Sequence, residues 1–167
     1  TSPSHIYINI TDSVQIHTAS LITISSYACI DTSFMDITVF PAPQAIFSID
    51  SVASCSPFNA TITNASVNAT IYDWDFGDGG SSNISDTIIN HYFENVTNSS
   101  FTFKIQLNVE NAYGCSSSYN HSVTLYPNLT AMFIHDPAGC SPFEVDFTNL
   151  SVGAESYYWT FGDGATS

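Results

Sequence analysis

The residues of this chain that could do chemistry are carboxylates, imidazoles, thiols and asparagines. The densest acidic cluster is Asp73, Asp75 and Asp78, which surrounds Trp74. Paired carboxylates can serve as a general acid and base, but alternating positions beside a tryptophan are typical of the surface and turn groups of a strand. No nucleophile has a partner base in the sequence, so we expect that this segment is not an enzyme.

The histidines and cysteines also lack the spacing of a metal centre. The cysteines form no C-x-x-C pair. The histidines are scattered along the chain at His5, His17, His91, His121 and His135. Asp75 and Asp78 offer hard oxygen ligands for calcium, although no D-x-D-x-D loop accompanies them. We therefore expect no metal and no cofactor, with calcium at these two aspartates as the alternative.

The charge balance excludes several classes of partner. Lys104 is the only basic residue against fifteen acidic ones, which gives a formal charge of -14. Such a chain cannot present a surface that tracks phosphates, so nucleic acid is excluded and anionic membranes are disfavoured. No apolar run approaches the roughly 18 residues that a membrane span needs, and we expect no membrane insertion.

Asparagines supply the chemistry that the charges do not. Charged residues are only 10% of the chain, yet ten of its thirteen asparagines begin an Asn-X-Ser/Thr sequon. This excess predicts a densely N-glycosylated exterior in which covalent glycan replaces charge as the solubilising layer. The sequons begin at Asn9, Asn59, Asn64, Asn68, Asn83, Asn95, Asn98, Asn120, Asn128 and Asn149. Asn95 and Asn98 are too close for us to expect glycan on both.

The compartment follows from the same residues. Four cysteines together with dense sequons place the chain outside a reducing cytosol, and we expect an extracellular or cell-surface protein. No signal peptide is visible at Thr1, which predicts a mature, soluble segment.

The elements that position these residues are repeated along the chain. Trp74 and Trp159 are 85 residues apart, and the same offset carries Cys55-Ser56-Pro57-Phe58 onto Cys140-Ser141-Pro142-Phe143. A second set of matches, including Cys29 with Cys115, has an offset of 86. The chain is therefore predicted to be a tandem array of units of this size, which is suitable for small sandwich domains.

The repeated residues resemble the PKD domain, an immunoglobulin-like module first named in polycystic kidney disease proteins. The resemblance rests on Trp74-Asp75-Phe76-Gly77-Asp78-Gly79, on the Cys-Ser-Pro-Phe before it, and on the alternating run 101–109 with the turn 111–114 after it. It implies an all-β fold of tandem immunoglobulin-like sandwiches joined by short proline linkers.

Each central motif has a structural interpretation. The tryptophan is predicted to fill the space between two sheets, with the phenylalanine two positions later on the same side. Gly-Asp-Gly is expected to form a tight turn, because its glycines can take positive φ and its aspartate can bond local amides. The motif residues are Trp74, Phe76, Gly77, Asp78 and Gly79, then Trp159, Phe161, Gly162, Asp163 and Gly164.

We expect three units along the chain. Residues 1–41 are predicted to be the C-terminal half of a domain, with strands at 5–11, 14–24 and 30–40. Residues 42–127 are predicted to be a complete domain, and residues 128–167 the N-terminal half of a third. The strands expected in the complete domain are 44–49, 58–64, 71–77, 85–92, 101–109 and 117–126. In 14–24, either Ile16, Ile22 and Ile24 or Ala19 and Leu21 could face inward.

The two halves are complementary, which suggests how the units join. They would be completed either by the next repeat of a longer polypeptide or by strand exchange between subunits, and truncation of a longer chain is the plain alternative. Head-to-tail joining does not close, so the predicted function is structural, in an extracellular filament or surface fibre whose partner is the protein itself. The alternative is a set of spacer or binding modules, for protein or carbohydrate, within a larger adhesin or secreted enzyme.

The fold that the resemblance implies also predicts how the cysteines pair. In such a sandwich Cys55 and Cys115 lie at opposite ends, farther apart than the roughly 5–6 Å between bridged Cα atoms. We therefore predict disulfides across domain junctions, from Cys55 to Cys29 of the following repeat and from Cys140 to Cys115 of the following repeat. Unpaired cysteines are the alternative.

Overall fold

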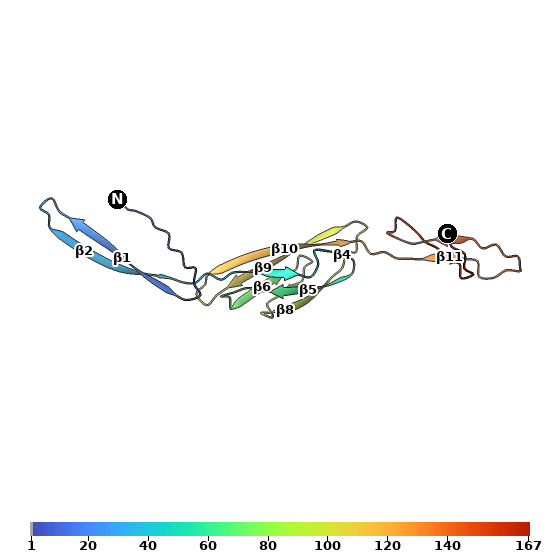
Figure 1. Cartoon of the computed structure of the whole chain (residues 1–167), viewed down its shortest axis with the longest axis horizontal. Coiled ribbons are helices and arrows are strands. Elements are labelled where there is room, and N and C mark those ends of the chain that lie inside the picture. The colour runs from blue at the N-terminus through green and yellow to red at the C-terminus, as the bar shows by residue number, and fades with distance from the viewer. Residues whose placement is uncertain (1) are drawn as a thin grey trace.

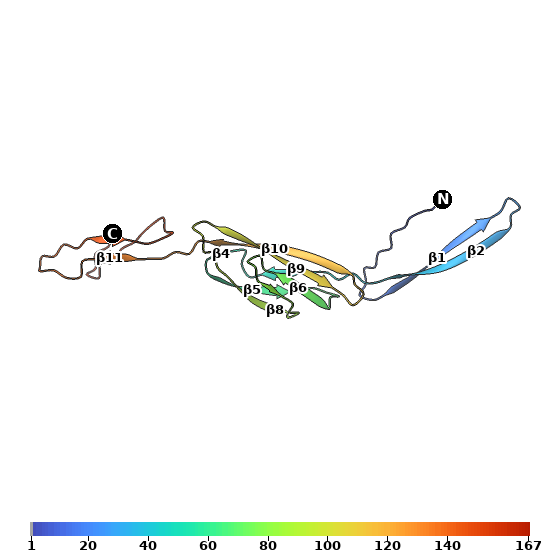
Figure 2. The same ribbon diagram turned by 180° about the vertical axis from the view of Figure 1, so that it is seen from behind.

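The computed structural model describes residues 2–167, and all regular elements of this part of the chain are strands. The molecule is long and narrow (Figure 1). A two-stranded hairpin forms one end, a double-layered domain lies in the middle, and a second small two-stranded sheet forms the other end (Figure 2). The expected all-β sandwich class is confirmed. Within residues 2–167 no helix is long and apolar enough to cross a membrane.

The middle domain contains two sheets packed face to face. One has the strand order β4 (Ala53–Cys55), β10 (Ser116–Tyr126), β9 (Phe101–Glu110), β6 (Ile71–Asp75) and β7 (Ser81–Ser82). The other has the order β3 (Phe47–Ile49), β5 (Phe58–Asn64) and β8 (Ile88–Phe93). Neighbouring strands are antiparallel except for β4 and β10, which run parallel.

Strand β9 lies at the centre of its sheet, between β10 and β6, and its strict alternation of side chains buries one face. Phe103, Ile105, Leu107 and Val109 are all buried, because successive side chains of a strand point to opposite faces. Trp74 on the neighbouring β6 is fully buried between the two sheets. Its ring meets that of Phe47 edge to face at 5.1 Å, and its indole N–H donates to the Ile84 carbonyl at 3.1 Å. The predicted core plug is therefore in place.

The two outer parts expose residues whose counterparts in the middle domain are buried. The hairpin of β1 (Gln15–Ile24) and β2 (Ile30–Val39) leaves Leu21 63% exposed. The small sheet of β11 (Phe133–His135) and β12 (Phe147–Asn149) leaves Phe133 52% exposed. Each part is one layer of strands with no second layer over it in the described chain.

Equivalent hydrogen bonds occur within the hairpin part and within the middle domain. The Asn95 amide nitrogen donates to the Ser99 and Leu125 carbonyls at 2.8 and 2.9 Å. Asn9, 86 positions earlier, donates to the carbonyls of Ser13 and Val39 at 2.7 and 2.9 Å. The turn bonds recur as well, because Asn111 N–H to Cys115 O matches Ser25 N–H to Cys29 O.

A second set of equivalent contacts occurs within the middle domain and within the C-terminal part. The mutual pair of amide bonds between Gln44 and Val67 has its counterpart between Thr130 and Val152. The edge-to-face contact of Phe47 with Trp74 at 5.1 Å has its counterpart in Phe133 with Trp159 at 5.3 Å. Residues at the two sequence offsets thus adopt the same local geometry.

The strand predictions differ from the structure in several places, including residues 76–77, which lie beyond the end of β6 at Asp75. Residues 5–11 form no strand, because they have no strand partner. In the middle domain the corresponding strand, β8, pairs with β5, and no counterpart of β5 lies beside residues 5–11. Strands β4 and β7 were not predicted, since segments of three and two residues carry no readable alternation. Residues 44–46 and 85–87 lie outside the strands that begin at Phe47 and Ile88.

The open question of which face of β1 points inward is answered by the segment that covers it. The Tyr7 ring lies 5.2 Å from that of His17, and Ala19 is half-buried on the same face. Ile16 on the other face is 65% exposed. The partly covered face is therefore that of His17 and Ala19, as one of the two alternatives has it for Ala19, while Leu21 on the same face is 63% exposed.

Candidate functional site

The glycine-rich turn of the middle domain is built against strand β9. Gly77 has a φ of +78°, and a Cβ placed on it would lie 2.5 Å from the backbone oxygen of Lys104. Gly79 also has a positive φ, of +91°, but faces open space. Asp75 accepts a hydrogen bond from the Gly77 amide at 2.9 Å. The motif therefore forms the tight turn that was predicted, and Gly77 also lets this turn approach the backbone of β9 closely, which was not predicted.

Asp78 in this turn reaches the other sheet. Its Oδ1 accepts the Gly80 amide at 2.8 Å, and its Oδ2 lies 2.7 Å from Nε2 of His91 on β8. Partial burial raises the pKa of Asp78. The hydrogen bonds from His91 and Gly80 and the charge of a protonated His91 together lower the pKa by more, so it lies below its ordinary value. The carboxylates of Asp75 and Asp78 are thus engaged in turn and sheet contacts. In residues 2–167 no three His, Cys, Asp or Glu side chains gather as a metal site would require, and the metal and cofactor expectations stay predictions.

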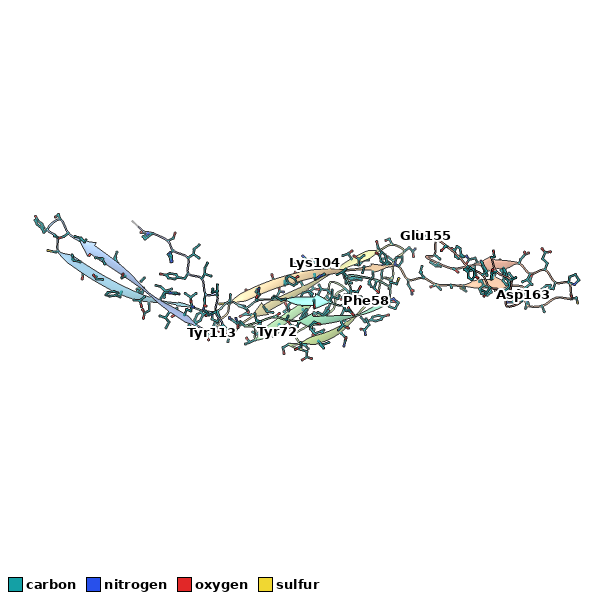
Figure 3. All side chains as sticks on the ribbon, viewed as in Figure 1. Phe58, Tyr72, Lys104, Tyr113, Glu155 and Asp163 are labelled. Carbon is teal, nitrogen blue, oxygen red and sulfur yellow. The ribbon has the colours of Figure 1, made fainter. Side chains whose placement is uncertain are left out.

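The same motif in the C-terminal part lies beside an open apolar groove. Trp159 is only half-buried, whereas Trp74 is fully buried. The groove has a volume of about 410 Å³. Its walls are mainly aromatic and aliphatic, including Met132, Phe133, Phe147, Tyr157, Trp159 and Phe161. Asp163 lies at this end of the molecule, with its side chain exposed (Figure 3). This groove is the principal candidate site of the described chain.

The junction between the hairpin and the middle domain is held by specific contacts. Phe40 stacks on Tyr113 with ring centroids 4.4 Å apart. The buried Asn111 amide donates to the Pro41 carbonyl at 2.8 Å, and its oxygen accepts the Tyr113 and Cys115 amides. Tyr113 lies where the hairpin meets the middle domain (Figure 3). The predicted turn at 111–114 therefore also fixes the linker, a role that the sequence pattern did not indicate.

The four cysteines are unpaired in residues 2–167. Cys55 pairs in register with Tyr126 at one end of β10, while Cys115 directly precedes β10 at the other end. An eleven-residue strand spans about 35 Å, far beyond the roughly 5–6 Å between bridged Cα atoms. Cys29 is at the tip of the β1–β2 hairpin and Cys140 is exposed in the C-terminal part. Pairing across junctions stays a prediction.

The structure divides the ten sequons by exposure. Seven asparagines are exposed, namely Asn59, Asn68, Asn83, Asn98, Asn120, Asn128 and Asn149. Three are buried, with exposed fractions of 9% for Asn9, 9% for Asn64 and 3% for Asn95. Glycan occupancy stays a prediction for the exposed sites, but the burial of the other three argues against glycan there in the folded chain.

Asn95 shows what the sequence interpretation missed. Its amide nitrogen, the atom that would carry a glycan, donates to two backbone carbonyls, and its oxygen accepts the Thr97 amide and hydroxyl. The asparagine and threonine of the sequon thus form a local turn that caps the end of β10. In the sequence an Asn-X-Thr triplet looks the same whether it is a glycosylation site or a structural turn. The only sign of the structural role is that Asn9 and Thr11, at the equivalent positions, make the same hydrogen bonds.

Comparison with known proteins gives one family and a fold. A scan against protein-family models matches the PKD domain over residues 40–126. No curated protein matches the chain. Among solved structures, carbohydrate-binding modules from the β-sandwich superfamily are 22% identical with a TM-score of 0.44, covering 64% of this chain and 52% of that one. The chain thus spans about half the length of that structure.

Two single-domain structures from Vibrio are also similar. The PKD1 domain of the Vibrio cholerae metalloprotease PrtV is 20% identical with a TM-score of 0.39, covering 51% of this chain and 98% of that domain. The PKD1 domain of Vibrio anguillarum Epp is 18% identical with a TM-score of 0.40, covering 52% of this chain and 96% of that domain.

Proposed function

Because this chain belongs to the PKD domain family, with its matching domain at residues 40–126, we propose that it is a structural protein of an extracellular, N-glycosylated filament or surface fibre. Residues 1–41 of one repeat complete the open groove of residues 128–167 in the preceding repeat. The partner is a second copy of the same sequence, either a separate subunit or the next stretch of one polypeptide.

One observation carries this proposal: the middle domain contains both halves already packed together. Strands β9 and β10 are the counterparts of β1 and β2 at an offset of 86. The strand around Trp74 and the strands β3 and β5 are the counterparts of the walls of the groove. What one outer part lacks, the other outer part supplies.

The β6–β9 ladder of the middle domain serves as the template for the register that we propose for the joint. Trp74 lies opposite Leu107 and Tyr72 opposite Val109 in the β6–β9 ladder. The corresponding pairs would be Trp159 with Leu21 and Tyr157 with Thr23. This pairing covers the exposed face of Trp159 with Ala19 and Leu21, and removes apolar surface from water in both partners.

Head-to-tail contacts of this kind use two different surfaces, so each added copy presents a new groove and a new hairpin. Such assemblies form open filaments unless the rotation between units closes a ring. The exposed sequons lie in the middle domain and in the C-terminal part, from Asn59 to Asn149. Glycan on them would supply the polar surface that the few charged residues do not.

A glycine substitution tests the joint. A Cβ placed on Gly162 would have nothing within 4 Å, whereas a Cβ on its counterpart Gly77 would meet the Lys104 backbone at 2.5 Å. Gly162→Ala should therefore block assembly by a clash with the Thr18 backbone of the incoming copy. Gly164→Ala is the matched control, because neither Gly164 nor its counterpart Gly79 has a neighbour within 4 Å.

Assembly of both variants is compared with the parent by sedimentation velocity. Both glycines have positive φ, so both alanines strain the backbone alike and only the clash differs. Equal assembly of the two variants would contradict the proposed joint. A parent chain that remains monomeric at all concentrations would favour the alternative, in which these domains are spacers or binding modules of a larger adhesin or secreted enzyme.

Electrophoresis of native material distinguishes the two forms of partner. Under denaturing and reducing conditions after deglycosylation, one long polypeptide keeps a very high mass. Separate subunits collapse to a single band near the mass of the repeat, 18.1 kDa.

A further inference from the structure

The middle domain contains a polar contact that connects its two sheets beside the core. His91 comes from β8 of one sheet, and Asp78 comes from the turn between β6 and β7 of the other. Their Nε2 and Oδ2 atoms are 2.7 Å apart, and the two side chains are 19% and 22% exposed. The His91 ring stacks on Phe76 at 3.8 Å and meets Phe93 edge to face at 4.6 Å. The imidazole is thus held between two aromatic rings with its nitrogen directed at the carboxylate.

The same four side-chain positions occur again, divided between the two ends of the chain. Asp163 and Phe161 are the counterparts of Asp78 and Phe76, and His5 and Tyr7 are those of His91 and Phe93. Asp163 Oδ1 already accepts the Ala165 amide at 2.9 Å, as Asp78 Oδ1 accepts that of Gly80 at 2.8 Å.

The histidine half of the contact is also preformed. The His5 and Tyr7 rings meet edge to face at 4.7 Å and 79°, close to the 4.6 Å and 70° of His91 and Phe93. Within residues 2–167 neither His5 nor the second oxygen of Asp163 has a hydrogen-bond partner. Each half of the contact is therefore arranged, and each lacks the other.

We propose that His5 of one repeat binds Asp163 of the preceding repeat, and that this pair fixes the register of the head-to-tail joint. The inference rests on the proposed function, because the partner is the second copy that completes the groove. His5 would stack on Phe161 and lie opposite Val145, as His91 lies opposite Ala60 in the β5–β8 ladder. Residues 2–7 then add a strand beside residues 143–148 and acquire the strand partner that they lack here.

The charge of the chain explains why a histidine matters at this position. The sequence has fifteen acidic residues and one basic one, Lys104, which lies on β9 of the middle domain. Attraction between copies therefore cannot come from lysine or arginine at the joint. The other histidines of the two outer parts are differently placed: His17 lies against Tyr7, and His135 bonds the Asp136 carbonyl. Among these histidines only His5 corresponds to a histidine that contacts an aspartate in the middle domain, namely His91, and that aspartate has its own counterpart in Asp163.

A charge exchange tests the pair. His5→Asp alone places two carboxylates together, and Asp163→His alone places two imidazoles together, so each should weaken association of the 167-residue chain about tenfold. The double variant restores an opposite pair in the same place and should recover most of the lost association. His121→Asp is the control for an added carboxylate, because His121 lies on β10 away from the joint.

Association is measured by sedimentation velocity, with the thermal unfolding of the middle domain as the test that every variant is folded. If the parent assembles and neither single variant changes its association, the His5–Asp163 pair is wrong while the proposed joint stands. If both singles weaken association but the double variant does not recover, the side chains do not meet. If the parent does not assemble, the proposed joint and this pair fail together.

Discussion

Replacing Asn95 by alanine tests whether this sequon is a structural element. The change removes four hydrogen bonds, two donated by the amide nitrogen to the Ser99 and Leu125 carbonyls and two accepted by the oxygen from Thr97. Thr97 is exposed, and water can replace its two bonds. The bond to Leu125 is buried, so the substitution takes away a donor from a carbonyl that lies inside the folded domain.

The expected loss of stability follows from these bonds. Loss of the bond to Ser99 costs about 1 kcal/mol, and loss of the donor to the buried Leu125 carbonyl costs about 1–3 kcal/mol. Asn95→Ala should therefore lower the free energy of unfolding of the middle domain by about 2–4 kcal/mol. Asn95→Asp should be no better, because it keeps the acceptor but sets a carboxylate oxygen against two carbonyl oxygens.

Urea unfolding followed by tryptophan fluorescence measures this loss, since Trp74 is buried in the same domain. Asn98→Ala is the matched control, because Asn98 also begins a sequon but is exposed, and its replacement should cost less than about 0.5 kcal/mol. Glycopeptide mapping of native material should find Asn95 unmodified. A loss below about 1 kcal/mol for Asn95→Ala, or glycan on Asn95 in folded protein, would refute the reasoning.

Three further predictions concern the turn, its acid sensitivity and the thiols. Gly77→Ala should destabilise the middle domain by more than about 3 kcal/mol, because strain adds to overlap with the Lys104 backbone, whereas Gly79→Ala should cost only the strain of about 1–2 kcal/mol; equal losses in urea unfolding would contradict this. The pKa of Asp78 is lower in the folded state, so its stabilisation is present above about pH 4 and is lost as the pH falls through the folded value. Asp78→Asn should remove that part of the acid dependence of the urea midpoint. In oxidised filaments, peptide mapping should find Cys55 joined to Cys29 of the following repeat, and a Cys55–Cys115 peptide would exclude this arrangement.

Periodic burial made the sandwich predictable. The alternation of β9 and the repeated tryptophan motif identify strands that bury one face, because a buried sheet face demands an apolar residue at every second position. The Gly-Asp-Gly turn was predictable for a related reason, since Gly77 must take a φ that other residues avoid.

Features that depend on a distant partner were not predictable. Strand β7 has two residues and exists only because Trp74 and Asp75 provide a ladder for it. The reverse holds for residues 5–11, whose alternation predicts a strand but whose ladder partner is not beside them. Asp78 and His91 lie in different sheets and are 13 residues apart in the sequence, and no sequence pattern indicates that they are in contact.

The direction of the strands in the middle domain has a consequence for how it bears tension. The chain enters at Pro41 and leaves at Tyr126, at opposite ends of the long strands, so a pull on the chain acts along the strands (Figure 1). Ladder hydrogen bonds lie across the strands, and a pull of this kind shears all of them together instead of opening them one by one. The ten register pairs between β9 and β10 must then yield at once, and the domain resists extension as a single unit.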